Sequence, residues 1–334
     1  MTPRLLPFPL LLGLLGGLVA LLFVASLLVG PSDLGPHRAI AALFGGDGAA
    51  TLVMREIRLP RAILGLTIGA TLGLTGAVLQ GWLRNPLADA GVLGIGSSAA
   101  LGAVVAVVCG IAGAFPLALP LSALIGAAAA AFLVFALAGS DAGSDTLILA
   151  GVAVSSLTAA MTALALNLSA NPFATMEIVF WTMGSLGDRS LDHVFLALPF
   201  MVVGWVMLAG VGRSLDALTL GAETAASLGV RVGRVRVIIL FATAAAVGAG
   251  TAVAGVVGFV GLVVPHVLRP LVGALPSRLM AASALGGAAL LLLADLTVRV
   301  VLPTRDLKLG VVTAIVGAPF FFRLILRERG RTIR

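Results

Sequence analysis

A short polar segment at residues 84–89, Arg-Asn-Pro-Leu-Ala-Asp, interrupts a chain that is otherwise strongly apolar. Residues 62–83 before it and residues 90–140 after it contain no charged side chain. A charge pair beside Asn-Pro is costly in hydrocarbon, so the segment is either a turn at a membrane face or the lining of a protein-enclosed path. Which of the two it is bears directly on what the protein does.

The residue patterns of an enzyme active site are missing from the sequence. No cluster of His, Cys, Asp or Glu has metal-ligand spacing, and Cys109 is the single cysteine, so no disulfide forms within one chain. Lys308 is the only lysine and follows Leu307, which excludes a GxxxxGK[ST] phosphate-binding loop. We therefore expect no catalytic residue, metal or cofactor on this chain, and we expect any ATP and Mg to bind a partner subunit.

Composition identifies the class of protein. Of 334 residues, 60% are hydrophobic, only 10% are charged and 42 are glycine, whereas a soluble protein carries about 25% charged residues. Long continuous apolar runs favour a polytopic, all-α membrane protein in a lipid bilayer. The net charge of +7 comes almost wholly from arginine, and no soluble domain offers a basic face to nucleic acid. We expect one transmembrane domain over residues 1–334.

About 20 residues are needed for one crossing, and the apolar runs supply ten. The run 237–268 exceeds one crossing, and Gly255, Gly258 and Gly261 indicate a break within it. Residues 172–187 are predicted to form a short helix near the surface. The ten crossings are expected near residues 8–30, 62–82, 92–111, 116–138, 146–168, 193–211, 235–254, 257–273, 279–302 and 309–326.

Arginines between the crossings set the expected orientation. The segment 213–236 and the C-terminal tail are rich in arginine, so we place both in the cytoplasm, with both termini there and the chain in the cell (inner) membrane. The loop 31–61 then lies outside although it contains four arginines. Either long loops simply tolerate such charges, or these arginines meet an acidic partner outside the cell.

The segment 213–236 is also the best candidate for a contact with a partner that binds ATP. Residues 223–229, Glu-Thr-Ala-Ala-Ser-Leu-Gly, predict a short helix that ends at a glycine cap. One interpretation is an ordinary amphipathic connector. The Glu-Ala-Ala…Gly pattern instead resembles the coupling helix of ATP-binding cassette (ABC) importers, and we favour that interpretation.

Further segments, spread over about 270 residues, extend the resemblance. Together they resemble the permeases of the FecCD/BtuC-like family, the type II ABC importers for iron-siderophores, haem and vitamin B12. One departure is Ala90, which stands where the family usually has proline. The matching segments are 58–61 (RLPR), 76–80 (GAVLQ), 85–89 (NPLAD), 91–94 (GVLG), 149–153 (LAGVA), 181–185 (WTMGS), 258–266 (GFVGLVVPH), 293–295 (LAD), 310–314 (GVVTA) and 317–321 (GAPFF).

The resemblance implies a type II ABC importer permease fold with about ten transmembrane helices. It also implies a second copy of the chain or a paralogue, two ATP-binding cassette ATPase subunits and a substrate-binding protein as partners. Carried over by position, it implies three sets of site residues: a cytoplasmic gate at Asn85, Pro86, Leu87, Ala88, Asp89, Ser144 and Asp145; ATPase coupling at Gly221, Glu223, Ala225, Ser227, Leu228 and Gly229; and binding-protein docking at Arg58, Arg61 and Arg299.

The expected function is that of a permease subunit that takes up an iron chelate, a ferric siderophore or haem, from a periplasmic or extracellular binding protein. Cobalamin is the alternative cargo within the same family. An ion-coupled secondary transporter is a further alternative, and it needs an acidic residue within the membrane. Asp295 is the only acid inside an expected crossing, and Arg299 at i+4 indicates a structural ion pair instead.

Overall fold

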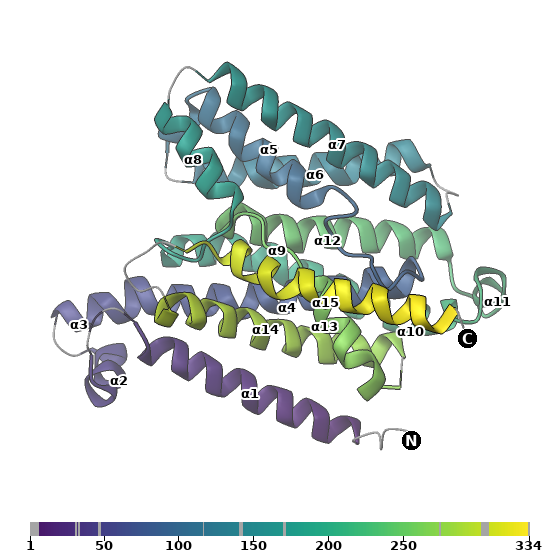
Figure 1. The fold of residues 1–334 in the computed structure, drawn as a ribbon, viewed down its shortest axis with the longest axis horizontal. Helices are drawn as coiled ribbons and strands as arrows, with labels where there is room; N and C mark the ends of the chain where they lie inside the picture. Colours follow the sequence, from purple (N-terminus) through teal and green to yellow (C-terminus); the bar gives the residue numbers. More distant parts are fainter. Residues whose placement is uncertain are drawn as a thin grey trace.

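The computed structural model describes residues 7–30, 32, 34–45, 48–115, 117–139, 143–169, 172–273, 275–301 and 307–332. Every regular element within these ranges is helical, and most of the long helices run side by side in one bundle (Figure 1). The α-helices are α1 (Phe8–Leu28), α2 (Pro36–Phe44), α3 (Gly48–Leu52), α4 (Leu59–Trp82), α5 (Ile95–Val108), α6 (Ala118–Ala138), α7 (Ser144–Leu168), α8 (Pro172–Thr182), α9 (Leu191–Ala209), α10 (Gly212–Leu218), α11 (Ala222–Ser227), α12 (Val232–Ala254), α13 (Val260–Leu268), α14 (Pro276–Val301) and α15 (Leu309–Thr332).

The described helices match the ten expected crossings in order. Seven of them are long and apolar enough to cross a membrane: α1, α4 with the segment before it, α6, α7, α9, α12 and α14. Three shorter apolar helices lie at the other expected positions, namely α5, α13 and the first half of α15. The expectation of an all-α, multi-pass membrane fold is confirmed.

The segment expected as an outer loop, residues 31–61, is largely helical where it is described. The helix α2 begins at Pro36, whose fixed φ suits the first helical turn. It ends at Gly45, whose φ of 112° favours glycine. A π-helical turn, Val53–Arg58, then leads into α4 without an intervening loop.

The helix α4 is the centre of the bundle, and it contacts α13 and α14 backbone to backbone. It packs against α14, α13, α9, α12 and α1. A Cβ atom added at Gly73 would lie 1.9 Å from the carbonyl oxygen of Ser283 in α14, and one at Gly76 would lie 2.0 Å from that of Gly261 in α13. The small residues that sequence composition associates with close helix packing therefore occur where the helices touch.

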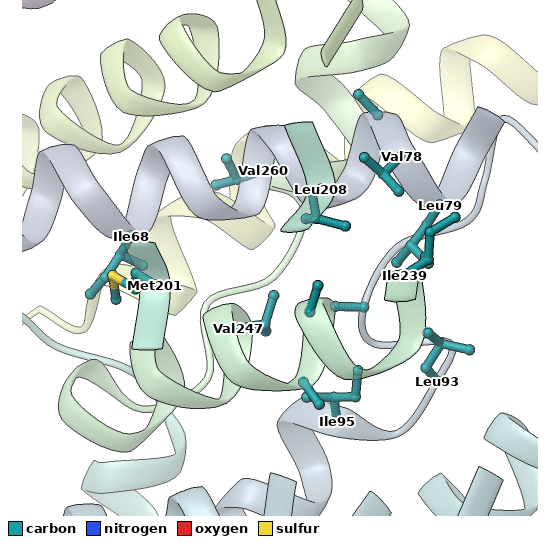
Figure 2. Packing of buried hydrophobic residues seen from close by; sticks show 14 of the residues in the cluster. Ile68, Val78, Leu79, Leu93, Ile95, Met201, Leu208, Ile239, Val247 and Val260 are labelled. Atoms are coloured by element: carbon teal, nitrogen blue, oxygen red, sulfur yellow. The ribbon is translucent and has the colours of Figure 1, made fainter. Parts of the chain in front are cut away.

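A second group of helices, α5 to α7, packs in the same manner. Added Cβ atoms at Gly102 and Gly126 would each lie 2.1 Å from a backbone oxygen of the partner helix in the α5–α6 pair. The helix α12 connects the two groups because it contacts α4 and α9 as well as α5 and α6. Figure 2 shows the buried side chains at this contact, with Met201 of α9 beside Ile68 of α4.

The long apolar run after α11 is broken, as its glycines predict. The helix α12 ends at Gly255, which has a φ of 72° and approaches the carbonyl oxygen of Trp181 so closely that a Cβ would lie 2.0 Å from it. The chain is non-helical from Gly255 to Phe259, and α13 begins at Val260. An irregular stretch inside a membrane domain requires protein around it, and the backbone N–H of Ser185 donates to the carbonyl of Ala254 here, at 2.7 Å.

Candidate gate, coupling and docking sites

The polar segment that interrupts the apolar sequence lies in a turn between α4 and α5, here called the polar turn (residues 83–94). Two of its side chains accept hydrogen bonds from backbone N–H groups two residues later. The bond from Leu87 to Asn85 Oδ1 is 2.9 Å long, and that from Gly91 to Asp89 Oδ1 is 2.8 Å. Asn and Asp stabilise turns in this way, so these side chains fix the turn's shape.

The polar turn also lines a partly enclosed cavity of about 70 Å³. Asp89 and Gly91 form one wall, while Thr75 of α4, Thr251 of α12 and the irregular stretch before α13 form the others. Burial raises the pKa of the Asp89 carboxyl, and the backbone N–H groups of Gly91 and Val92 partly oppose that rise. Asp89 of the polar segment therefore lines a partly enclosed cavity as well as stabilising the turn.

The helix α7 begins with one half of the predicted gate and contacts the polar turn. Ser144 and Asp145 begin this helix, with Asp145 in its first turn, where a negative charge is favourable. About two turns later, Gly151 lies so close to the polar turn that an added Cβ would be 2.1 Å from the carbonyl oxygen of Val92. The contact thus involves Val92 rather than residues 85–89, and the gating role of these residues stays a prediction.

The predicted coupling segment forms the short helix α11. Its end has the two hydrogen bonds typical of a glycine cap, from Val230 N–H to the Ala225 carbonyl at 3.0 Å and from Gly229 N–H to the Ala226 carbonyl at 2.9 Å. Gly229 has a φ of 86°. Ala225 is buried, whereas Glu223, Ser227, Leu228 and Gly229 are exposed. The helix thus anchors one small residue and leaves a free face.

The three arginines predicted to dock a binding protein gather at the other end of α4, around the C-terminal end of α1. Arg58 donates to the carbonyl oxygens of Leu27, Leu28 and Ser32 at 3.0, 2.9 and 2.7 Å. Arg299 donates to the carbonyls of Ser26 and Val29 at 2.8 and 3.0 Å. Apart from the bond to Ser32, these bonds satisfy carbonyls that the end of a helix leaves without intrahelical partners. We call Arg58, Arg61, Arg299 and Asp295, together with these carbonyl groups, the arginine cluster.

Asp295 holds the other two arginines of the arginine cluster. Its carboxylate accepts from Arg61, with 2.8 Å between Arg61 Nη2 and Asp295 Oδ1, and it pairs with Arg299 one turn along α14. The ion pair expected from the i,i+4 spacing is confirmed. Arg58 and Arg299 are buried, while the side chain of Arg61 is 20% exposed. The structure therefore gives all three arginines partners within the chain, and their docking role stays a prediction.

Two further polar contacts were not expected from the sequence. The guanidinium Nη2 of Arg84 donates to the carbonyl of Leu218 at the end of α10. The Oδ1 atom of Asp216, also in α10, accepts from the backbone N–H of Ser277 at 2.9 Å. The position of Arg84 in a strongly apolar part of the sequence indicates that its charge needs a partner. Nothing in the sequence around Asp216 indicates that it bonds to a backbone group 61 residues away.

Comparisons with known proteins agree with this arrangement. The sequence model of the FecCD transport family matches residues 18–327. The chain is 39% identical to the cobalamin import system permease protein BtuC of Halobacterium salinarum over 288 residues, which cover 86% of this chain and 76% of that one. It is 37% identical to the hemin transport system permease protein HmuU of Yersinia pestis (82% and 83% covered). It is 38% identical to the Fe(3+) dicitrate transport system permease protein FecD of Escherichia coli K12 (88% and 91% covered).

A solved structure shares the fold over nearly its whole length. It is described as an inward-facing conformation of a metal-chelate type ABC transporter, and it superimposes with a TM-score of 0.83 at 30% identity. The match covers 96% of this chain and 99% of the other. The polar turn, the short helix α11 and the multi-pass helical bundle are thus found in a chain that belongs to the FecCD transport family and is the membrane permease subunit of an ABC importer.

Proposed function

We propose that this permease imports an iron chelate, either a ferric siderophore or haem. A substrate-binding protein delivers the chelate, and ATP hydrolysis on separate ATPase subunits drives the import. The observation that carries the proposal is the exposure of α11 and its C-cap residue, with Leu228 63% exposed and Glu223 also exposed. A partner that covers small residues, one acid and one leucine would gain apolar burial and a charge contact. The hemin and ferric dicitrate permeases among the relatives support an iron chelate as the cargo.

The positions of the helices at the two ends of the bundle support the assignment of different partners to the two membrane faces. The helix α1 begins, and α15 ends, on the side where α10 and α11 lie, and α2 and α3 lie on the opposite side (Figure 1). Because segment 213–236 is rich in arginine, we assign its side to the cytoplasm. Both termini are then cytoplasmic in the cell (inner) membrane, the ATPase subunits bind α11, and the binding protein docks near the arginine cluster.

The state of Asp295 supports ATP-driven rather than ion-coupled transport. A coupling-ion site requires an acidic group that exchanges its ion or proton. Asp295 accepts hydrogen bonds from Arg61 and pairs with Arg299, so cations of the chain itself neutralise its charge. We further propose that two copies of the chain form the pathway between them, with residues 85–89 and the start of α7 as its cytoplasmic gate.

The test of cargo and energy source is uptake into proteoliposomes that contain the permease, its ATPase subunits and its binding protein. We expect ATP-dependent uptake of a ⁵⁵Fe-labelled siderophore or of haem, and none without ATP. Cobalamin is measured in parallel, because the halobacterial relative is named as a cobalamin permease. Uptake of cobalamin alone would replace the proposed cargo. Uptake that persists without the ATPase but collapses with the ion gradient would overturn the proposal.

The test of the coupling segment is the replacement of residues 223–229 by a Gly-Ser linker of equal length. We expect the ATPase subunits to lose stimulation by the binding protein and uptake to fall at least tenfold, because the exposed face of α11 is gone. The control is a Gly-Ser replacement of residues 110–113 at the far end of α5, which are exposed except for the half-buried Ala112. Unchanged uptake per ATP in the linker variant would remove α11 from the coupling mechanism.

A further inference from the structure

The helix α10 joins the coupling helix to the polar turn through a single carbonyl group. The carbonyl oxygen of Leu218 accepts from the backbone N–H of Gly221 at 3.2 Å, in the turn that leads into α11. The same oxygen accepts from the guanidinium of Arg84, the residue that opens the polar segment. A displacement of the α10–α11 turn therefore changes the geometry of a hydrogen bond made by the polar turn.

The same short helix also holds the start of α14. Ser277 is the second residue of α14, where backbone N–H groups have no intrahelical acceptor. Asp216 of α10 supplies that acceptor at 2.9 Å. A carboxylate at a helix N-terminus is favoured further by the helix dipole, so Asp216 connects α10 to α14 by a charge-assisted bond.

The helix α10 packs against both α4 and α14. A Cβ at Gly212 would lie 3.4 Å from the Ser277 Cβ, and a Cβ at Gly81 in α4 would lie 3.4 Å from the Pro276 Cβ. Leu215 is fully buried. We call this meeting of α10, the end of α4 and the start of α14 the α10 junction (residues 81–84, 212–218 and 276–280).

Arg84 adopts a backbone conformation that non-glycine residues rarely adopt. Its φ is 50°, a region that costs a residue with a Cβ conformational energy. The side-chain bond to Leu218 stabilises Arg84 in that conformation. The polar turn and the α10–α11 turn are thus each held in place by the same contact.

We propose that Arg84 and Asp216 are positioning residues that transmit the displacement of α11 to the polar turn and to α14. This inference rests on the proposed role of α11 in ATPase coupling. Arg84 carries the motion toward the candidate gate, and Asp216 carries it into the helix that packs along α4. Neither residue touches ATP or cargo in this role, so substitutions change how much cargo moves per ATP rather than the hydrolysis itself.

The test is the ratio of cargo transported to ATP hydrolysed by the complete complex in proteoliposomes. For Arg84→Ala and Asp216→Ala we expect ATPase activity within about twofold of wild type and a ratio lowered at least fivefold. Asp216→Asn keeps an Oδ1 acceptor for Ser277 and should retain at least half of the wild-type ratio. The control is Cys109→Ser, which changes an exposed side chain at the far end of α5, away from α10 and α11, and should leave the ratio unchanged.

Assembly is checked for each variant by co-purification with the ATPase subunits. If Arg84→Ala does not assemble, Arg84→Gln replaces it, since glutamine stays polar but is shorter and lacks the charge that strengthens the bond. Assembled variants at both positions that transport at the wild-type ratio would overturn the proposal. The linker variant of residues 223–229 is run beside them. If the linker variant is uncoupled while the Arg84 and Asp216 variants keep the wild-type ratio, only this inference fails. If the linker variant keeps the wild-type ratio as well, the proposed role of α11 fails.

Discussion

At the scale of single residues, the arginine cluster at the end of α1 is held together by one acid. Asp295 is 1% exposed and bonds to both Arg61 and Arg299. Buried arginines require partners because an unpaired buried charge is strongly unfavourable. Backbone carbonyls at the end of α1 supply the remaining acceptors, so Asp295 and α1 together stabilise positive charge inside the protein.

Removing the carboxylate should therefore destabilise the fold. We expect Asp295→Ala to lower the free energy of unfolding by about 3–5 kcal/mol, the usual cost of removing one partner of a buried ion pair. Thermal or denaturant unfolding of the purified protein in detergent measures this change. Glu56→Ala is the control, because Glu56 lies near the same end of α4 and is exposed. Equal effects of the two substitutions would contradict the structural role of Asp295.

Asp89 should make stability depend on pH. Burial raises the pKa of its carboxyl in the folded protein, so the folded state binds the proton more readily than the unfolded chain. The stability that this protonation provides is present at low pH and is lost as pH rises through the folded-state pKa. Asp89→Asn keeps the Oδ1 acceptor but cannot ionise. We expect its melting temperature to exceed that of wild type at pH 8, with the difference shrinking toward pH 4. A difference independent of pH would refute this explanation.

At the scale of helices, α4 and its neighbours are fixed by contacts between main chains. Gly73→Ala would place a Cβ 1.9 Å from the Ser283 carbonyl oxygen, and α14 would have to move away. We expect the free energy of unfolding to fall by about 1–3 kcal/mol, as for other overpacked interiors. Gly13→Ala in α1 is the matched control, since nothing lies within 4 Å of its added Cβ. That control should be neutral or stabilising by up to about 1 kcal/mol. Similar melting temperatures for both variants would contradict the close approach of α4 and α14.

Much of the helical arrangement could be predicted because it depends on local patterns. Apolar length indicates a crossing, Gly255 indicates the break after α12, and Gly229 indicates the end of α11. The contacts of charged side chains could not be predicted in the same way. Arg58 bonds to main-chain carbonyls 26 to 31 residues away, and Arg84 bonds to one 134 residues away. Every residue has a carbonyl, so the sequence does not show which one an arginine will reach.

The burial of Arg58 shows how sequence position and accessibility can differ. An arginine in a long segment outside the expected crossings is predicted to be exposed, yet Arg58 is 3% exposed. The reason is the π-helical turn, which continues into α4 and directs the side chain against the end of α1. Arg61, one turn later, is more accessible than its two companions in the arginine cluster.

At the scale of the whole molecule, opposite ends of the bundle carry different groups. The arginine cluster with α2 and α3 lies at one end, and the polar turn with the α10 junction and α11 lies at the other. The helix α5 leads away from the polar turn for 14 residues, or about 20 Å. The exposed Cys109 directly after it therefore lies toward the end that we assign to the outside.

This arrangement predicts which positions react with a membrane-impermeant maleimide. We expect Cys109 to be labelled in intact spheroplasts. In a Cys109→Ser background, Ser227→Cys on the exposed face of α11 should be labelled only after the membrane is permeabilised. Labelled protein is measured by its mass shift on a gel, and Cys109→Ser alone is the unlabelled control. The reverse pattern would invert the assigned orientation.

The main-chain contacts of α4 have a mechanical consequence. Where backbone meets backbone, no side chain can change rotamer to absorb a displacement, so α4, α13 and α14 are expected to rotate as one rigid body. The α5–α6 pair, which packs in the same way, forms a second body. The polar turn is the covalent link between these bodies on the side of α11. We expect the Asn85 and Asp89 bonds to fix the shape of this link, so that the two bodies change their relative angle while each keeps its shape.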